Sequence, residues 1–208
     1  MQQLLLLSVA TFSAAFVASL PPGLLNMNAA KTSVEKGKKN GITFGLGVGF
    51  TVMIQAYLAV RIAKLLSQNP EIIEILMQLA LVIFGVLAIF FFVKGKKQTT
   101  DTVEFVEGKK RGSFSKGAFL AALNLLTIPY YAGINTFFNG QGFMNYTLMD
   151  EIIFIISAGC GTFLAMYVYV FYFDKMEQRT NRFSKNANYI LSGLMILLFA
   201  ITLLRLYF

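Results

Sequence analysis

The sequence contains no histidine and a single cysteine, Cys160, among its 208 residues. Without histidine there is no imidazole base, no histidine metal ligand, and no Ser-His or Cys-His pair. One cysteine cannot form an internal disulfide, a CxxC redox pair or a multi-cysteine metal site. We therefore expect that the protein is not an enzyme and that it holds neither a metal nor a cofactor.

Charged residues are also scarce, at 13% of the chain against about 25% in an average soluble domain. Hydrophobic residues make up 56%, including 21 phenylalanines. A globule of this length could not bury so much apolar surface in one core, so a lipid bilayer is the expected solvent. The net charge of +8 is then read as a topology signal, and no nucleic-acid partner is expected.

Six segments without Asp, Glu, Lys or Arg predict six transmembrane helices, because a spanning helix needs about 20 apolar residues. The segments are residues 4–30, 42–60, 75–93, 117–149, 152–173 and 186–204. The fourth is apolar only to about Phe138, and the polar stretch 139–145 after it is expected to be a loop. The fold class is therefore an all-α, multi-pass membrane protein forming one integral membrane domain.

Lysine and arginine concentrate in alternate connections between these spans. The connections after the first, third and fifth spans hold 15 of the 18 basic residues, and the others hold only Arg61, Lys64 and Arg205. Basic residues in short loops stay on the cytoplasmic side. We therefore expect a plasma-membrane protein, the inner membrane in a bacterium, with both termini outside the cytoplasm.

The two halves of the chain show a weak internal repeat. In each half a proline-interrupted span is followed by a span rich in small residues: Pro21 and Pro22 precede Gly45 and its neighbours, and Pro129 precedes Gly159 and its neighbours. Three spans are an odd number, so the second copy must be inverted. This predicts repeats at about 1–94 and 117–208, joined by a cytoplasmic linker at about 95–116.

Proline lacks a backbone N–H and breaks helices, so the first and fourth spans are expected to be broken at their prolines. In a bilayer such breaks must lie in the protein interior, and paired breaks in two halves mark a transporter's binding site. The half-helix after each break would offer N–H groups to an anionic group. The candidate substrate-binding residues are Pro21, Pro22, Gly23, Asn26, Asn124, Thr127, Pro129, Tyr130 and Tyr131.

Two alternatives remain open for these features. The prolines could merely kink packed helices whose Asn and Thr side chains satisfy the released carbonyls. Gly41, Gly45 and Gly49 recur every four residues and share one helix face, which favours helix packing but also fits a substrate path or a homo-oligomer seam.

Tyr167, Tyr169 and Tyr172 fit an aromatic belt at the cytoplasmic end of the fifth span.

The first half resembles the LysE/RhtB-type amino-acid exporters of the lysine exporter superfamily. The resemblance is carried by Pro21-Pro22-Gly23-Leu24-Leu25-Asn26, by the basic turn at 35–41 and by Gly45-Leu46-Gly47-Val48-Gly49. It implies six spans in inverted halves, alternating access and export of an amino acid. The chain departs from the family pattern at Leu24, at Ile128, and at Phe50 and Thr51, where a proline, an asparagine and an acidic residue are usual.

None of the six segments contains a carboxylate, so a lysine-like side chain would lack a buried counter-charge. The expected substrate is therefore a neutral amino acid or a related small metabolite. The alternatives are a divalent-cation exporter of the same fold, although hard cations prefer carboxylate oxygens, and a membrane scaffold without transport. Membrane lipid is the expected surrounding partner, and a homo-oligomer stays open.

Overall fold

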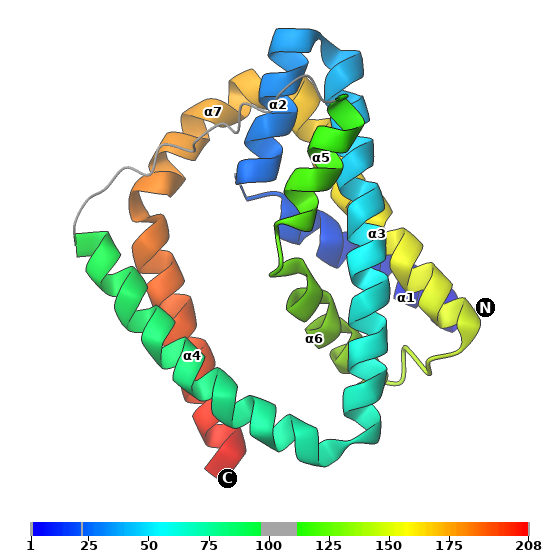
Figure 1. Ribbon diagram of the computed structural model, residues 1–208, viewed down its shortest axis with the longest axis vertical. Helices are drawn as coiled ribbons and strands as arrows, with labels where there is room; N and C mark the ends of the chain where they lie inside the picture. The colour runs from blue at the N-terminus through cyan, green and yellow to red at the C-terminus, as the bar shows by residue number, and fades with distance from the viewer. Residues whose placement is uncertain (1, 22, 97–111, 208) are drawn as a thin grey trace. The chain divides into compact units, whose positions relative to one another are not determined.

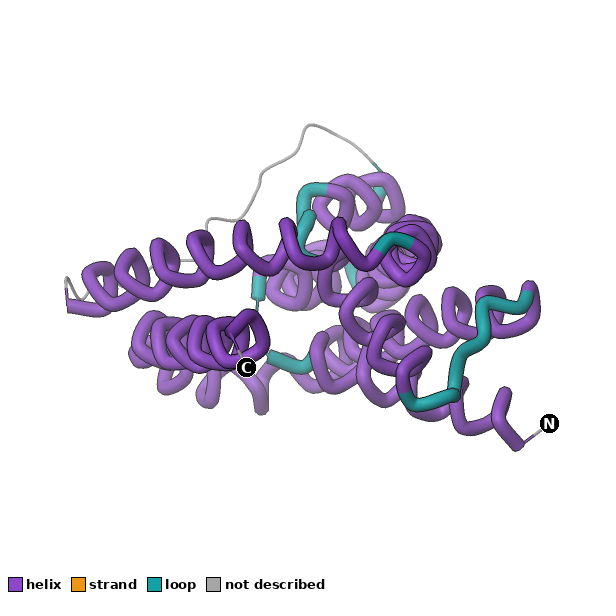
Figure 2. Tube along the Cα trace, turned by 90° about the horizontal axis from the view of Figure 1, so that it is seen from below, coloured by secondary structure: helices purple, strands orange, loops and turns teal. Residues whose placement is uncertain are grey.

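A computed structural model describes residues 2–21, 23–96 and 112–207. Seven helices account for most of them: α1 (Gln2–Ser19), α2 (Leu24–Lys36), α3 (Lys38–Gln68), α4 (Pro70–Lys96), α5 (Ser113–Ala122), α6 (Thr127–Gly140) and α7 (Leu148–Tyr207). α7 is kinked at Tyr172, whose φ and ψ are −121° and 19°. Figure 2 shows only helices and connecting loops in the described ranges. The prediction of an all-helical protein is confirmed.

Several of these helices are long and apolar enough to cross a bilayer. Within the described ranges they are Gln2–Ser19, Lys38–Gln68 and Leu148–Tyr172, and the pair α5 and α6, bent by 68°, adds a fourth candidate span. Two expected spans fall on α4 and on the end of α7, where shorter apolar stretches occur at Leu81–Phe90 and Met195–Leu204. The chain is thus a multi-pass membrane protein.

The chain divides into two compact units. Unit 1 combines Met1–Ser67 with Phe105–Phe173, and unit 2 combines Gln68–Glu104 with Asp174–Phe208. In unit 2, α4 packs against the last part of α7: the Ser192 hydroxyl donates to the Ala88 carbonyl at 3.0 Å, and the rings of Phe92 and Tyr189 meet edge to face. The expected linker at 95–116 lies mostly outside the described residues, and α5 begins inside it, at Ser113.

In unit 1, α3 is the central helix and presents two adjacent faces to its neighbours. One face carries Gly41, Gly45 and Gly49, where an added Cβ would lie 2.9 Å from Val170, 3.0 Å from Met166 and 3.1 Å from the Gly159 carbonyl, all on α7. Missing side chains allow this close helix approach. The three glycines therefore pack against α7 in this structure.

The other face of α3 lies against α5. An added Cβ at Gly47 would collide with the Phe114 carbonyl, and one at Gly117 would collide with the Phe44 carbonyl. Four residues beyond Gly47, the Thr51 hydroxyl donates to the Ala118 carbonyl at 3.3 Å. The two backbones are therefore in direct contact, which fixes the position of α5 against α3.

We predict that Gly117→Ala lowers the stability of the fold by about 1–3 kcal/mol, because the new methyl group must push two helix backbones apart. Gly133→Ala is the matched control, since no atom lies within 4 Å of its added Cβ and alanine is the better helix former. Thermal unfolding in detergent measures both. Equal melting temperatures for the two variants would contradict the α3–α5 contact.

Candidate functional site

Two helix breaks lie side by side in unit 1. The first separates α1, which ends at Ser19, from α2, which begins at Leu24; the second separates α5, which ends at Ala122, from α6, which begins at Thr127. α2 packs against α5, and the Tyr130 hydroxyl of α6 donates to the Ala14 carbonyl of α1 at 2.9 Å. The two broken elements therefore run antiparallel with their breaks at one level (Figure 1).

Three consecutive carbonyls at the first break are held by side chains. Asn26 Nδ2 donates to the Ser19 carbonyl at 2.7 Å and to the Pro21 carbonyl at 2.8 Å. The Tyr169 hydroxyl of α7 donates to the Leu20 carbonyl at 2.7 Å. Tyr169 is fully buried, so it faces the protein interior and the expectation of an aromatic belt is wrong for this residue.

The second break is held in the same way by Gln55 of α3. Its Nε2 donates to the Ala121 carbonyl at 3.1 Å and to the Asn124 carbonyl at 3.2 Å. Gln55 is 5% exposed, and its Oε1 is buried without a hydrogen-bond partner among the described residues. The one signal for this role in the sequence is the rarity of an amide in an apolar span.

The two half-helices that follow the breaks begin differently. α2 has Gly23 as its N-cap, with no side-chain cap, so the first-turn N–H groups of Leu24 and Leu25 have neither an earlier helical turn nor a capping oxygen. At α6, Thr127 and Ile128 donate to the Asn124 and Leu125 carbonyls in tight turns. The expectation of exposed N–H groups thus applies at α2 and is wrong at α6.

Pro129 is the third residue of α6, in the first turn, where its missing N–H costs no helical hydrogen bond. The helix therefore breaks just before this proline. Pro129 itself does not line the space between the breaks, and Pro22 lies outside the described residues.

A cavity of about 630 Å³ lies between the two breaks. Of the residues expected from the sequence, its lining includes Pro21, Gly23, Asn26, Asn124, Thr127, Tyr130 and Tyr131. The described residues that line it include no Asp, Glu, Lys or Arg. The arrangement can thus receive a small molecule with polar ends, but it offers no charged side chain to a charged one.

Sequence reasoning missed several lining residues, of which Thr162 of α7 is the most connected. Its hydroxyl accepts from Ser19 at 3.4 Å and lies 3.3 Å from the Tyr131 hydroxyl. It thereby links α1, α6 and α7 beside the first break. The neighbouring Gly161 allows this approach, since its added Cβ would collide with the Phe12 carbonyl of α1.

A family model for the LysE type translocator matches residues 16–206, nearly the whole chain. The chain belongs to this family. No curated protein and no solved structure matches the chain. As a LysE type translocator the protein is a transporter and not an enzyme, and family membership implies a small-molecule substrate, namely an amino acid or a related compound.

At the far end of α3 from the cavity, a buried carboxylate of the translocator ties α3 to α7. Glu151 is 5% exposed; its Oε2 lies 3.4 Å from Arg61 Nη2 and its Oε1 lies 3.6 Å from Lys64 Nζ. The preceding Asp150 accepts the Asn145 N–H at 2.9 Å and closes the loop before α7. This charge cluster therefore fixes one end of the bundle.

We predict that Asn26→Leu, which keeps the size of the side chain, destabilises the fold by about 1–3 kcal/mol because the Ser19 and Pro21 carbonyls lose their donor. Asn145→Leu, in the exposed loop before α7, is the control and should change stability much less. Thermal unfolding in detergent compares them. A harmless Asn26→Leu would show that the first break does not depend on this amide.

We predict that Glu151→Gln destabilises the fold by about 1–3 kcal/mol, since two cations lose their shared buried partner. The control is Glu35→Gln, which removes the pair between the exposed Glu35 and the half-buried Lys31 on one helix and should cost about 0.5 kcal/mol or less. The measurement is the melting temperature of each variant. An equal shift in both would contradict the clamp between α3 and α7.

Proposed function

We propose that this LysE type translocator exports a neutral amino acid or a related small metabolite across the plasma membrane. The observation that carries the proposal is the uncharged cavity between the two helix breaks. A lysine-like or glutamate-like side chain would be removed from water there without a partner, and such a burial costs several kcal/mol. A zwitterion carries its two charges close together and needs only one donor group and one acceptor group.

The donors for the substrate carboxylate are the first N–H groups of α2. Gly23, Leu24 and Leu25 all line the cavity, and the positive end of the α2 dipole lies at the same place. Asn26 also lines the cavity, but both of its observed hydrogen bonds go to the carbonyls of the break. We therefore assign Asn26 to holding the break in shape and the backbone to binding the carboxylate.

The acceptors for the substrate ammonium are oxygen atoms on the other wall. Asn124 and Thr127 of the second break line the cavity, and so do Tyr130 and Tyr131, whose rings meet edge to face with centroids 5.1 Å apart. Amide and hydroxyl oxygens accept from an ammonium, and a tyrosine ring face attracts a cation. Pro21 completes the site at the first break, where it lines the cavity.

The proposed architecture has six spans in two inverted repeats, at about 1–94 and 117–208, with a linker at about 95–116. Support comes from the antiparallel arrangement of the two broken elements and from the basic connections of the sequence. In this architecture both termini lie outside the cytoplasm. Transport follows by alternating access as one repeat rocks against the other around the cavity. Lipid surrounds the bundle.

The proposal predicts that Leu24→Pro weakens amino-acid binding by about 10-fold. Proline is tolerated at the first position of a helix, and Gly23 before it is already extended (φ −149°, ψ −177°), so the variant removes one N–H donor without breaking α2. A charge-assisted hydrogen bond is worth about 1.5–3 kcal/mol, and a tenfold change in binding corresponds to the lower end of that range. The measurement is efflux of radiolabelled L-leucine, L-alanine and L-threonine from proteoliposomes, together with their binding constants.

Leu148→Pro is the matched control, because Leu148 is the first residue of α7 and is exposed away from the cavity. It should bind and transport as the wild type does. Leucinamide, whose neutral amide replaces the carboxylate, should lose less affinity in Leu24→Pro than L-leucine does. The proposal fails if no amino acid is bound or released by the wild type, or if Leu24→Pro transports normally.

A further inference from the structure

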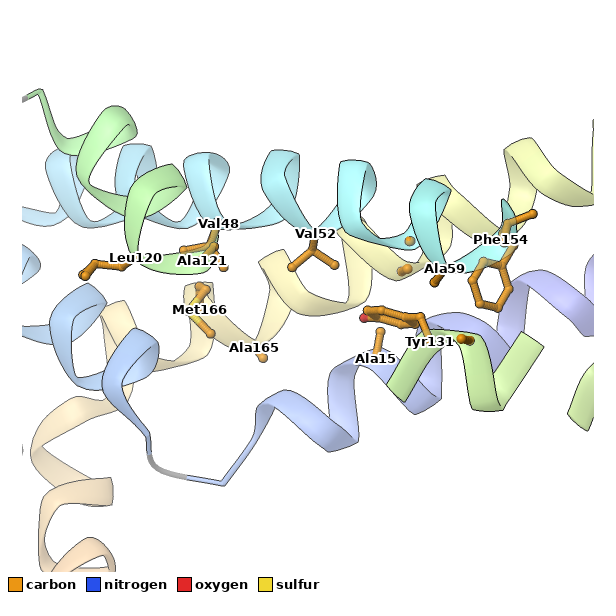
Figure 3. Packing of buried hydrophobic residues seen from close by; sticks show 14 of the residues in the cluster. Ala15, Val48, Val52, Ala59, Leu120, Ala121, Tyr131, Phe154, Ala165 and Met166 are labelled. Atoms are coloured by element: carbon orange, nitrogen blue, oxygen red, sulfur yellow. The ribbon is translucent and has the colours of Figure 1, made fainter. Parts of the chain in front are cut away.

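The apolar residues that line the cavity differ in how much surface they leave open. Val52, Leu120 and Met166 are only 3%, 1% and 1% exposed. Figure 3 shows them in the packed interior between α3, α5 and α7, where they offer almost no surface to a bound molecule. The apolar surface that a ligand can reach therefore comes from other lining residues.

Three leucines at the two helix breaks supply such a surface. Leu24 is the first residue of α2, directly after the first break, and it is 39% exposed. Leu123 directly follows α5 and Leu126 directly precedes α6, and they are 59% and 78% exposed. Leu125 of the same turn is 70% exposed but does not line the cavity. The place of each leucine in the turn, and not its exposure alone, decides which of them faces the cavity.

The turn that carries Leu123 and Leu126 is held by hydrogen bonds. The Leu123 N–H donates to the Phe119 carbonyl at 3.2 Å, and Gln55 Nε2 donates to the Asn124 carbonyl at 3.2 Å. Leu123 and Leu126 both have right-handed helical dihedral angles, with φ of −72° and −67° and ψ of −17° in each. The two side chains thus project from a backbone that does not have to be ordered by a ligand, which favours binding.

The hydrogen-bonding groups of the cavity have other partners. Asn26 donates to the carbonyls of the first break, Tyr130 donates to α1, and the Tyr131 hydroxyl pairs with a hydroxyl of α7. In the proposed function the start of α2 binds the substrate carboxylate, and Asn124 and Thr127 bind the ammonium. A polar side chain on the substrate would either compete with the ammonium or leave water without a partner, and both cost free energy.

An apolar side chain on the substrate meets the opposite situation. It gains free energy in proportion to the apolar area that it and the leucines remove from water. The cavity volume of about 630 Å³ lies within the range of about 300–1,000 Å³ that is usual for small-molecule sites, so a large side chain has room. A side chain as small as that of alanine would leave most of the leucine surface uncovered. Size and polarity therefore select in the same direction.

We propose that Leu24, Leu123 and Leu126 form a side-chain subsite that makes this translocator selective for amino acids with large apolar side chains, such as leucine, methionine and phenylalanine. This inference rests on the proposed function and adds its specificity-determining residues. Leu24 belongs to the first break and the other two leucines belong to the second. One bound side chain then contacts both broken elements.

The first experiment measures the binding of single amino acids to the purified wild-type protein by ligand-induced thermal stabilisation and by competition for radiolabelled L-leucine. L-leucine, L-methionine and L-phenylalanine should bind at least about 10-fold more tightly than L-alanine, L-serine and L-glutamine. Equal or tighter binding of any of the last three overturns the subsite while leaving amino-acid export intact. Absence of binding by all six overturns the proposed function as well.

The second experiment changes the turn of the second break. Leu123→Ser and Leu126→Ser should each reduce the leucine-to-alanine affinity ratio by about 5-fold or more, because they remove apolar surface that only the larger ligand covers. Leu125→Ser is the matched control, since it makes the same replacement in the same turn at an exposed residue outside the cavity lining. Its ratio should equal that of the wild type. A reduction in Leu125→Ser as large as in Leu126→Ser would contradict the subsite.

The third experiment separates the side chain of Leu24 from its backbone N–H. Leu24→Ala keeps the N–H donor, so it should weaken the binding of L-leucine and leave that of L-alanine near the wild-type value. Leu24→Pro removes the donor and should weaken the binding of both amino acids. Leu148→Ala is the control, because Leu148 is the first residue of α7 and is 71% exposed away from the cavity.

An unchanged leucine-to-alanine ratio in Leu24→Ala, Leu123→Ser and Leu126→Ser together overturns the assignment of the subsite. The melting temperature of each variant without ligand shows whether it folds. If one variant does not fold, the selectivity of the wild type and the variants at the other break still decide the proposal.

Discussion

The requirement that every buried backbone carbonyl finds a donor governs the centre of this protein. A broken helix in a bilayer releases carbonyls that water cannot reach freely, and each unmet group costs free energy. The chain satisfies this requirement with two amides and a phenol: Asn26 and Tyr169 at the first break, and Gln55 at the second. Each of these side chains donates its hydrogen bonds to backbone, which leaves the cavity to the substrate.

The amides can act only because helix α3 approaches its neighbours so closely. On the face that meets α5, Gly47, Thr51 and Gln55 recur every four residues and contact successive turns of α5. The direct backbone contact at Gly47 sets the helix separation at which the Gln55 amide reaches the last carbonyls of α5. The hydrogen bonds of Gln55 therefore depend on the close packing of α3 against α5. A methyl group added at Gly47 or Gly117 disturbs the packing and the hydrogen bonds together.

Local features of the fold were predictable from the sequence, whereas its long-range pairings were not. The prolines located the two breaks and the glycine spacing indicated a packing face of α3, because proline and glycine act on the backbone at their own positions. Gln55 and Tyr169 could not be assigned, since their partners lie 66 and 149 residues away along the chain. The start of α6 was mispredicted because two carbonyls of the preceding turn, those of Asn124 and Leu125, accept the first N–H groups of α6. A proline in the sequence does not reveal such a turn.

Under the proposed function, the distribution of charge allows one cavity to bind a zwitterion and still release it. In the described part of unit 1 the buried ionic contact, at Glu151, lies at one end of the bundle, and exposed lysines such as Lys36 and Lys39 lie at the other. The cavity between them offers only backbone dipoles and neutral oxygens. Dipoles offset most of the desolvation of a carboxylate or an ammonium, but they do not hold it as an opposite charge would. A cavity that binds each charged group only through dipoles therefore lets the proposed substrate leave as well as enter.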